Sequence, residues 1–176
     1  LAPQALAVLL ADTSWMANAD LHAAAQVLNL PLRFIHSTTE LPPEHHAGDG
    51  LRLLLGEQPL DIERLGQRRG RLSVVGLGPG AAEHMTPAVR RALDEAEDLL
   101  GYDTYVKMAG PLRADQCLHP SDNREELQRA AHAFELAATG RRVVMISSGD
   151  PGVFAMAAAV MEALESPQND AWHGVE

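Results

Sequence analysis

Hydrophobic and polar positions alternate most regularly in the second part of the chain, from about residue 71 onward. Residues 72–75 form a short apolar run, which predicts a buried strand. Thr86 followed by Pro87 is a typical helix start, because threonine accepts hydrogen bonds from free backbone N–H groups and proline has no N–H to satisfy there. Apolar residues then recur with helical period at Val89, Ala92, Leu93, Ala96 and Leu100. Residues 99–102 predict the next strand, so the segment has the order of a βαβ unit.

The same alternation continues beyond this unit. Asp122 and Glu125 have the spacing of a helix N-cap and the third helical residue, and Gly140 suits the left-handed conformation after a helix end. Residues 142–146 predict a third strand, which an alanine-rich helix follows. The pattern predicts an α/β fold with a parallel sheet covered on both faces and ligand sites in the loops at the carboxyl ends of its strands. Three such loops are unusual in composition: residues 76–80, 102–107 and 147–152.

The first part of the chain predicts a smaller, βαβ-like piece. Residues 5–10 and 32–35 are apolar runs that predict two strands. Between them, Asp20 can cap a helix that ends at Asn29. A piece of this size is too small to bury a core alone.

The connection between the two parts has no regular pattern. Residues 37–50 have the composition of a loop, and residues 51–65 are amphipathic enough for a short helix that Gly56 and Pro59 interrupt. A polar stretch then ends near residue 70, where we expect the domain boundary. The sequence thus predicts three parts: a βαβ-like segment over residues 1–50, a linker over 51–70 and an α/β domain over 71–176.

Composition and charge exclude several classes of protein. The 176 residues are 46% hydrophobic, yet no apolar run approaches the roughly 18 residues that a membrane span requires, and the start does not resemble a signal peptide. A net charge of −10 argues against a broad nucleic-acid-binding face. Cys117 is the only cysteine, which excludes an internal disulfide and favours a reducing, cytoplasmic location. No metal site is expected, since His45-His46, and Cys117 with His119, lack the third and fourth ligands.

The first candidate for chemistry is the glycine-rich turn at residues 76–80, Gly-Leu-Gly-Pro-Gly. The Walker pattern fails because no Gly-Lys-Ser/Thr follows, and the dinucleotide fingerprint requires its last glycine one place later. Pro79 also has no N–H to offer a phosphate. Asp103 still imitates the ribose-binding acid of NAD proteins, so an NAD site stays an alternative. Any tight turn uses glycine, but three in five positions favour a ligand site: Gly76, Gly78 and Gly80.

The second candidate is the loop from Ser148 to Phe154, Ser-Gly-Asp-Pro-Gly-Val-Phe. Its glycines, Gly149 among them, allow close backbone approach or a positive φ. The Asp150 carboxylate either caps the following helix or, with neighbouring amides, holds a polar, cationic ligand. A third candidate, Asp103, lies between two tyrosines, where a buried carboxyl group would suit proton transfer, although it can equally cap a turn.

Three segments in this order, VGLGPG, GYDTYV and SSGDPGVF, resemble the tetrapyrrole methylase family across residues 71–176. Within this family, GYDTYV, residues 120–125 and SSGDPGVFAMAA are similar to the group that methylates C17 of precorrin-3B with ring contraction in cobalamin (corrin) biosynthesis. The resemblance implies an S-adenosylmethionine (SAM)-dependent methyltransferase with Gly76, Gly78 and Gly80 on the substrate side. Asp103 corresponds to an aspartate that is a proposed proton acceptor in related enzymes. The SAM contacts of the family map onto Pro79, Ser148, Gly149, Asp150 and Val153.

The resemblance also implies a longer polypeptide. Family members hold SAM between this domain and a second α/β domain, so we interpret Leu1 and Glu176 as cuts and expect residues 1–176 alone to be inactive. Residues 1–45 are similar to part of a cobalamin-biosynthesis accessory domain. The expected partner is a tetrapyrrole (precorrin) substrate, without nucleic acid or membrane, and the family allows a homodimer. A non-catalytic α/β binding or scaffold module, or an NAD-binding domain, remains the alternative.

Overall fold

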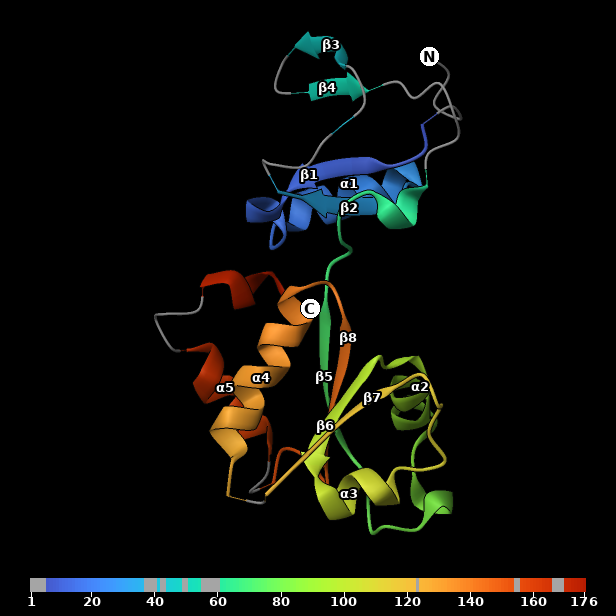
Figure 1. The fold of residues 1–176 in the computed structure, drawn as a ribbon, viewed down its shortest axis with the longest axis vertical. Coiled ribbons are helices and arrows are strands. Elements are labelled where there is room, and N and C mark those ends of the chain that lie inside the picture. The colour runs from blue at the N-terminus through green and yellow to red at the C-terminus, as the bar shows by residue number, and fades with distance from the viewer. Residues whose placement is uncertain are drawn as a thin grey trace. The chain divides into compact units, whose positions relative to one another are not determined.

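The computed structural model describes residues 6–36, 41, 44–48, 51–54, 61–122, 124–153, 156–165 and 170–176. The chain divides into two compact units, Leu1–Arg68 and Arg69–Glu176 (Figure 1). Across the described residues, no helix is long and apolar enough to cross a membrane. The first unit has two sheets of two strands each, and the second unit has one sheet of four strands.

A parallel sheet of four strands forms the centre of the second unit. Its strands are β5 (Arg71–Gly76), β6 (Asp98–Tyr102), β7 (Cys117–Ser121) and β8 (Arg142–Ser147). Their order in the sheet is β5-β8-β6-β7, and every pairing is parallel. The predicted α/β fold with a parallel sheet is therefore confirmed, whereas strand β7 was not expected from the sequence.

Helices cover both faces of this sheet. The helices are α2 (Pro87–Glu95), α3 (Asp103–Met108), α4 (Glu126–Ala138) and α5 (Met156–Leu164), with α4 and α5 on one side and α2 and α3 on the other (Figure 1). Successive residues of β8 point to opposite faces, as the pleat of a strand requires. Val143 and Met145 therefore join the core under α4 and α5, while Val144 and Ile146 join the core under α2 and α3. Short 3-10 helices complete the unit at Ala82–His84 and Asp170–Gly174.

Local signals set the start of α2 and the end of α4. The Thr86 hydroxyl oxygen accepts from the Val89 backbone N–H at 3.3 Å, and Pro87 is the first helical residue of α2, as expected. Gly140 follows α4 with a φ of 88°, which confirms its predicted place after the helix end. The expected N-cap at Asp122 is wrong, because α4 begins at Glu126 and residue 125 is its N-cap.

The first unit contains the predicted βαβ-like piece and an additional hairpin. Strands β1 (Leu9–Asp12) and β2 (Leu32–Ile35) are parallel, joined by the 3-10 helix Thr13–Trp15 and by α1 (Ala19–Leu28). The N-cap of α1 is Asn18 and not Asp20, since the Asn18 side-chain oxygen accepts from the Leu21 backbone N–H at 2.8 Å. Part of the predicted strand, residue 5, lies outside the described residues.

The loop and helix expected after β2 are wrong in part. Strands β3 (Glu44–Gly48) and β4 (Leu51–Leu54) form an antiparallel pair, and among the residues of this stretch that the structure describes only the 3-10 helix Ile62–Arg64 is helical. The amphipathic pattern over 51–65 is a local signal for a helix. Residues 51–54 pair with β3 instead, and such pairing between strands overrides a local helical preference. The side chains of His45 and His46 lie outside the described part.

The last residue of the chain extends the sheet of the second unit. The Leu72 backbone N–H donates to the Glu176 carbonyl at 2.8 Å, and the Glu176 N–H donates to the Gly70 carbonyl at 2.9 Å. One residue bonded to positions two apart on a neighbouring strand is the pattern of a parallel ladder. Glu176 therefore pairs with the edge of β5 that β8 does not occupy.

Candidate active site

Two of the unusual loops are bonded to each other at the carboxyl edge of the sheet. The Gly78 N–H donates to the Gly149 carbonyl at 3.2 Å, and the Gly149 N–H donates to the Gly78 carbonyl at 3.0 Å. This reciprocal pair is a bridge of antiparallel type, and it lies two residues past Gly76 and Ser147, where the parallel pairing of β5 and β8 ends. The loops after β5 and β8 therefore form one structure.

Glycine at position 76 permits this close approach. An added Cβ there would lie 2.1 Å from the Gly149 carbonyl oxygen and 2.7 Å from Cδ of Pro151. The two bonded glycines, Gly78 and Gly149, have φ values of 65° and 58°, in the left-handed region that other residues rarely adopt. The glycine-rich composition is therefore explained by the contact between the loops.

A groove of about 770 Å³ lies beside the joined loops. Pro79 and Asp150 line it from the two loops, and His84 and Thr86 line it from the segment leading into α2. Small-molecule sites usually measure about 300–1,000 Å³. Of the residues proposed to contact SAM, the groove includes Pro79, Gly149 and Asp150 but not Ser148 or Val153. Those two are nearby in the loop, and the Val153 side chain is 63% exposed.

Asp150 has a local role in the loop. Its Oδ1 accepts from the Gly152 backbone N–H at 2.7 Å, an Asx turn within the loop itself. Helix α5 begins only at Met156, so this carboxylate does not hold the first turn of that helix. The residue is exposed at the rim of the groove. The simple helix-cap interpretation is thus replaced by a turn-stabilising one, which is compatible with a ligand contact.

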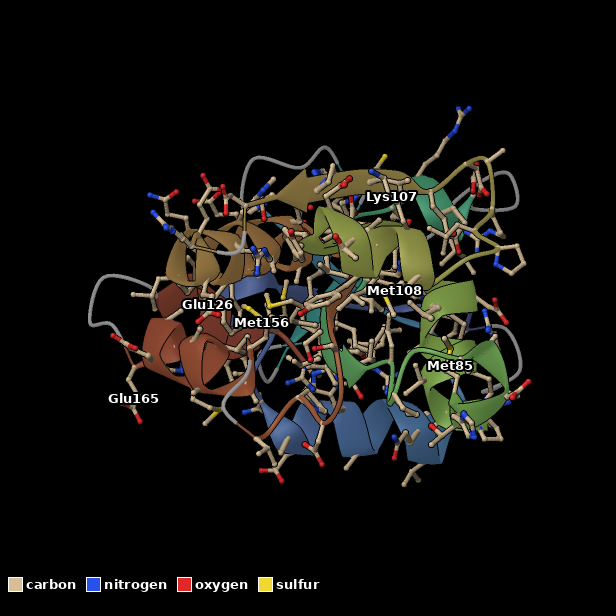
Figure 2. The ribbon with its side chains drawn as sticks, turned by 90° about the horizontal axis from the view of Figure 1, so that it is seen from below. Met85, Lys107, Met108, Glu126, Met156 and Glu165 are labelled. Carbon is tan, nitrogen blue, oxygen red and sulfur yellow. The ribbon has the colours of Figure 1, made fainter. Side chains whose placement is uncertain are left out.

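Asp103 lies on a different part of the same edge. It is the first residue of α3, and its carboxylate forms an ion pair with Lys107 at 2.5 Å, one helical turn later. Its side chain is 49% exposed, so the burial considered from the sequence is not observed. Helix α3 does approach the first loop, because a Cβ at Gly80 would lie 2.7 Å from Cε of Met108. Figure 2 shows this edge from below, with Lys107 and Met108 on α3.

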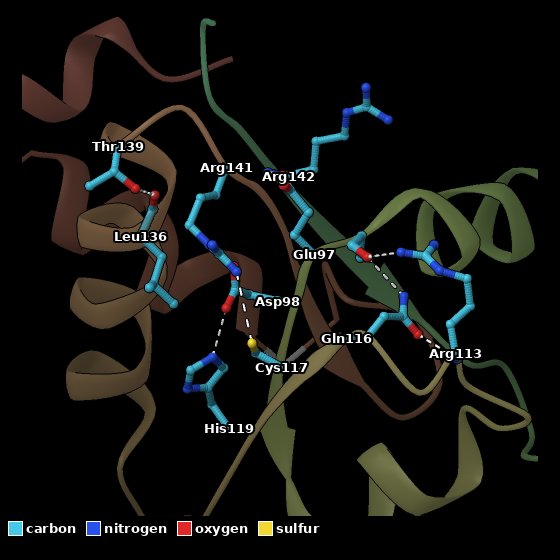
Figure 3. Close-up of polar contacts among 11 residues, drawn as sticks. Glu97, Asp98, Arg113, Gln116, Cys117, His119, Leu136, Thr139, Arg141 and Arg142 are labelled. Carbon is cyan, nitrogen blue, oxygen red and sulfur yellow. Dashed lines mark hydrogen bonds and ion pairs between the residues drawn. The ribbon is translucent and has the colours of Figure 1, made fainter. Parts of the chain in front are cut away.

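A second polar cluster lies at the opposite edge, where the strands begin. Asp98, the first residue of β6, accepts from His119 at 2.9 Å and from Arg141, and its side chain is 2% exposed (Figure 3). Burial alone would raise the pKa of Asp98, but the hydrogen bonds from Arg141 and His119 hold the pKa below its ordinary value of 3.8. The cluster therefore joins β6, β7 and the start of β8 without contributing to the groove.

Helix α2 ends near this same edge, just before β6 begins. The Gln116 amide donates to the carbonyls of Leu93 and Ala96 at 2.7 and 2.9 Å, and Arg113 donates to the carbonyls of Asp94 and Ala96. Figure 3 shows the Gln116 and Arg113 side chains next to each other. These bonds satisfy carbonyl groups that a helix end leaves unpaired. Within the described residues, no group of His, Cys, Asp and Glu side chains could hold a metal ion.

Comparison with known proteins identifies the class to which this fold and site belong. The family model for tetrapyrrole (corrin/porphyrin) methylases matches residues 71–175, which begin at the first residue of β5. The chain therefore belongs to the tetrapyrrole methylase family.

Named relatives agree with this assignment. A precorrin-3B C(17)-methyltransferase of Sinorhizobium sp is 50% identical over 107 residues, which cover 61% of this chain and 41% of the relative. A cobalamin biosynthesis protein CobIJ of Mycobacterium bovis is 50% identical over 114 residues, covering 62% of this chain and 21% of the relative. The crystal structure of the methyltransferase CobJ superimposes with a TM-score of 0.57 at 56% identity, covering 61% of this chain and 44% of that one. The chain thus spans less than half the length of these relatives.

His84 is a groove residue that sequence reasoning missed. It belongs to the short 3-10 helix between the first loop and α2, and it carries no motif of its own. The available signal was its position, between a glycine-rich turn and a helix cap at the same sheet edge. Residues near such a turn are candidates for the groove even without a recognisable pattern.

Proposed function

We propose that the native polypeptide containing these residues is a SAM-dependent C-methyltransferase that acts at C17 of precorrin-3B, with ring contraction, in cobalamin biosynthesis. The observation that carries the proposal is the pair of loops joined by reciprocal Gly78–Gly149 bonds beside a groove, in a chain of this family. The 50% identity to a protein named precorrin-3B C(17)-methyltransferase supports the choice of substrate.

The residues of the groove fit SAM as the methyl donor. SAM supplies an electrophilic methyl group on a positively charged sulfur. Asp150 contributes a carboxylate to the rim of the groove, and the exposed Val153 offers an apolar contact next to it. We assign Pro79, Ser148, Gly149, Asp150 and Val153 to the SAM side and Gly76, Gly78 and Gly80 to the substrate side.

The main contribution of the chain to the reaction is then positioning. Loops that are bonded to each other present a fixed wall, so little conformational freedom is lost when a ligand binds. Holding two reactants in line removes much of the entropic barrier of a bimolecular step. Asp103 is assigned the handling of a proton, and its ion pair with Lys107 orients the carboxylate.

The remaining assignments concern the whole polypeptide. We assign residues 71–176 to the first domain of the methylase, 51–70 to a linker and 1–50 to an accessory-like segment. A tetrapyrrole (precorrin) is the proposed substrate, and we propose a cytoplasmic enzyme that forms a homodimer and has no nucleic-acid or membrane partner. The names of relatives from cobalamin biosynthesis support the substrate class.

A binding titration with SAM and with NAD tests the proposal. The native polypeptide should bind SAM in calorimetry, should not bind NAD, and should transfer a labelled methyl group to precorrin-3B. Binding of SAM without transfer would favour a non-catalytic module, and binding of NAD alone would favour a dinucleotide site. The same assays on residues 1–176 should give very weak binding or none, since a ligand in a cleft takes its contacts from both walls.

A further inference from the structure

A buried arginine lies near the same edge of the sheet, and the reaction described above does not use it. Arg129, on the first turn of α4, is only 5% exposed. Its Nε donates to Oγ of Ser121 at 2.7 Å, one Nη to the Asp122 carbonyl at 2.5 Å, and the other Nη to Sδ of Met156 at 3.1 Å. These three partners come from two different segments of the chain.

Both segments belong to the site edge. Ser121 is the last residue of β7, and Asp122 begins the loop that follows it. Met156 is the first residue of α5, three positions after Val153 in the proposed SAM loop. Figure 2 shows Met156 beside the start of α4, which Glu126 marks. One guanidinium group therefore connects the loop after β7 to the first residue of α5.

Stability of the fold does not account for a positive charge at this buried position. No ion pair among the described residues includes Arg129. Burial lowers the pKa of Arg129, and the acidic groups of Glu126, Glu125 and Asp122 offset this only in part. A positive charge in the first turn also opposes the helix dipole. Replacing buried ionic groups by apolar residues of similar size is often neutral or stabilising.

We propose that Arg129 is a positioning residue for the SAM loop: its guanidinium fixes the start of α5, and with it residues 148–153, to the loop after β7. The inference rests on the proposed function, because it assigns Arg129 an effect on SAM binding. It acts through Met156 and does not touch the ligand. Arginine suits this role because its five N–H donors lie in a rigid planar fork, whereas the three donors of lysine share one nitrogen at the end of a flexible stem.

The test compares two substitutions in the native polypeptide. Arg129→Met keeps the length of the side chain but removes the charge and all donors. The groups left behind, the Ser121 hydroxyl and the Asp122 carbonyl, belong to partly or fully exposed residues that water can reach. We expect the thermal midpoint of Arg129→Met to equal or exceed that of wild type, while SAM binds about 10- to 100-fold more weakly. Arg129→Lys should recover part of this affinity.

Two controls separate positioning from general destabilisation. Arg91→Gln removes an exposed guanidinium from α2 and should change neither quantity. Phe134→Leu weakens the core of α4, where Phe134 stacks on Trp172 at 5.0 Å, and should lower the thermal midpoint with SAM affinity unchanged below the transition. Amide hydrogen exchange at Gly149 should speed up in Arg129→Met but not in Phe134→Leu.

Three outcomes would overturn the inference. Wild-type SAM affinity in Arg129→Met would show that the loop needs no such anchor. If Arg129→Met and Phe134→Leu both lost SAM affinity together with thermal stability and to the same extent, Arg129 would be a packing residue only. Equal affinity of Arg129→Met and Arg129→Lys would remove the role of charge and donors. Failure of the proposed function is distinct, since the wild-type polypeptide would then not bind SAM at all.

Discussion

Substitution of Gly76 by alanine would force the two joined loops apart. The added Cβ would lie 2.1 Å from the Gly149 carbonyl oxygen, whereas real Cβ atoms essentially never approach a neighbour within 3.0 Å. The obstructing atom belongs to the backbone, so no side chain can rotate away. The loops must separate by about 1 Å, which stretches both hydrogen bonds between Gly78 and Gly149 beyond useful length.

The magnitude follows from the bonds that are lost. A neutral backbone hydrogen bond contributes about 0.5–1.5 kcal/mol, so two of them contribute about 1–3 kcal/mol to holding the loops together. If SAM binds only to the joined arrangement, its affinity falls by the same free energy. The expected change is roughly 5- to 150-fold in the dissociation constant.

Calorimetry with SAM on the native polypeptide measures this change, and amide hydrogen exchange at Gly78 and Gly149 shows whether the loops have separated. Gly110→Ala is a matched control, since a Cβ at that position meets nothing nearer than 3.7 Å. Gly149→Ala is a milder second variant, with open space around its Cβ but a φ of 58° that costs about 1–2 kcal/mol. Wild-type SAM affinity in a folded Gly76→Ala protein would refute the view that the joined loops form the binding wall.

Three further changes test other residues. Asp150→Ala should weaken SAM binding about 10- to 150-fold, because a charge-assisted contact and the turn to Gly152 are both lost; unchanged affinity in calorimetry would leave Asp150 a turn residue only. Asp103→Asn should slow methyl transfer while SAM still binds, and normal turnover would remove Asp103 from the chemistry. Asp98→Asn should lower the free energy of unfolding by about 2 kcal/mol at neutral pH. Because the pKa of Asp98 is lowered in the folded state, its contribution is complete above pH 3.8 and is lost as pH falls through the folded pKa. The difference between wild type and Asp98→Asn in urea unfolding should therefore shrink below pH 3.8, and a constant difference would contradict the ion-pair account.

The sequence predicted the parts of the fold whose signals are local. Thr86 and Pro87 start α2, and Gly140 follows α4, because a cap depends only on its own few residues. Strand β7 was missed, since its residues 117–121 alternate weakly and include Pro120. Its position as an edge strand beside β6 tolerates a proline, but nothing in the local sequence indicates that partner.

The site was predicted in its outline but not in its contacts. The shared edge of the loops at 76–80 and 147–152 followed from the rule that parallel strands present their carboxyl ends together. The reciprocal bonds between Gly78 and Gly149 could not be derived, because they depend on β8 lying directly beside β5. Arg129 was equally hidden, since a lone arginine in an amphipathic helix is normally exposed.

The order of strands in the sheet has a consequence for the time course of folding. Strand β8 lies between β5 and β6, although the chain makes β5 and β6 first and β8 last. A nascent chain that ends before residue 142 has β5 without its central neighbour, and any direct pairing of β5 with β6 must break before β8 can enter. Contacts between residues far apart in the chain form slowly, because the loop between them must close first. The joined loops are therefore the last part of this sheet to form, so a ribosome-bound chain should protect the Gly78 and Gly149 amides from exchange only after the segment through Gly149 has emerged and inserted.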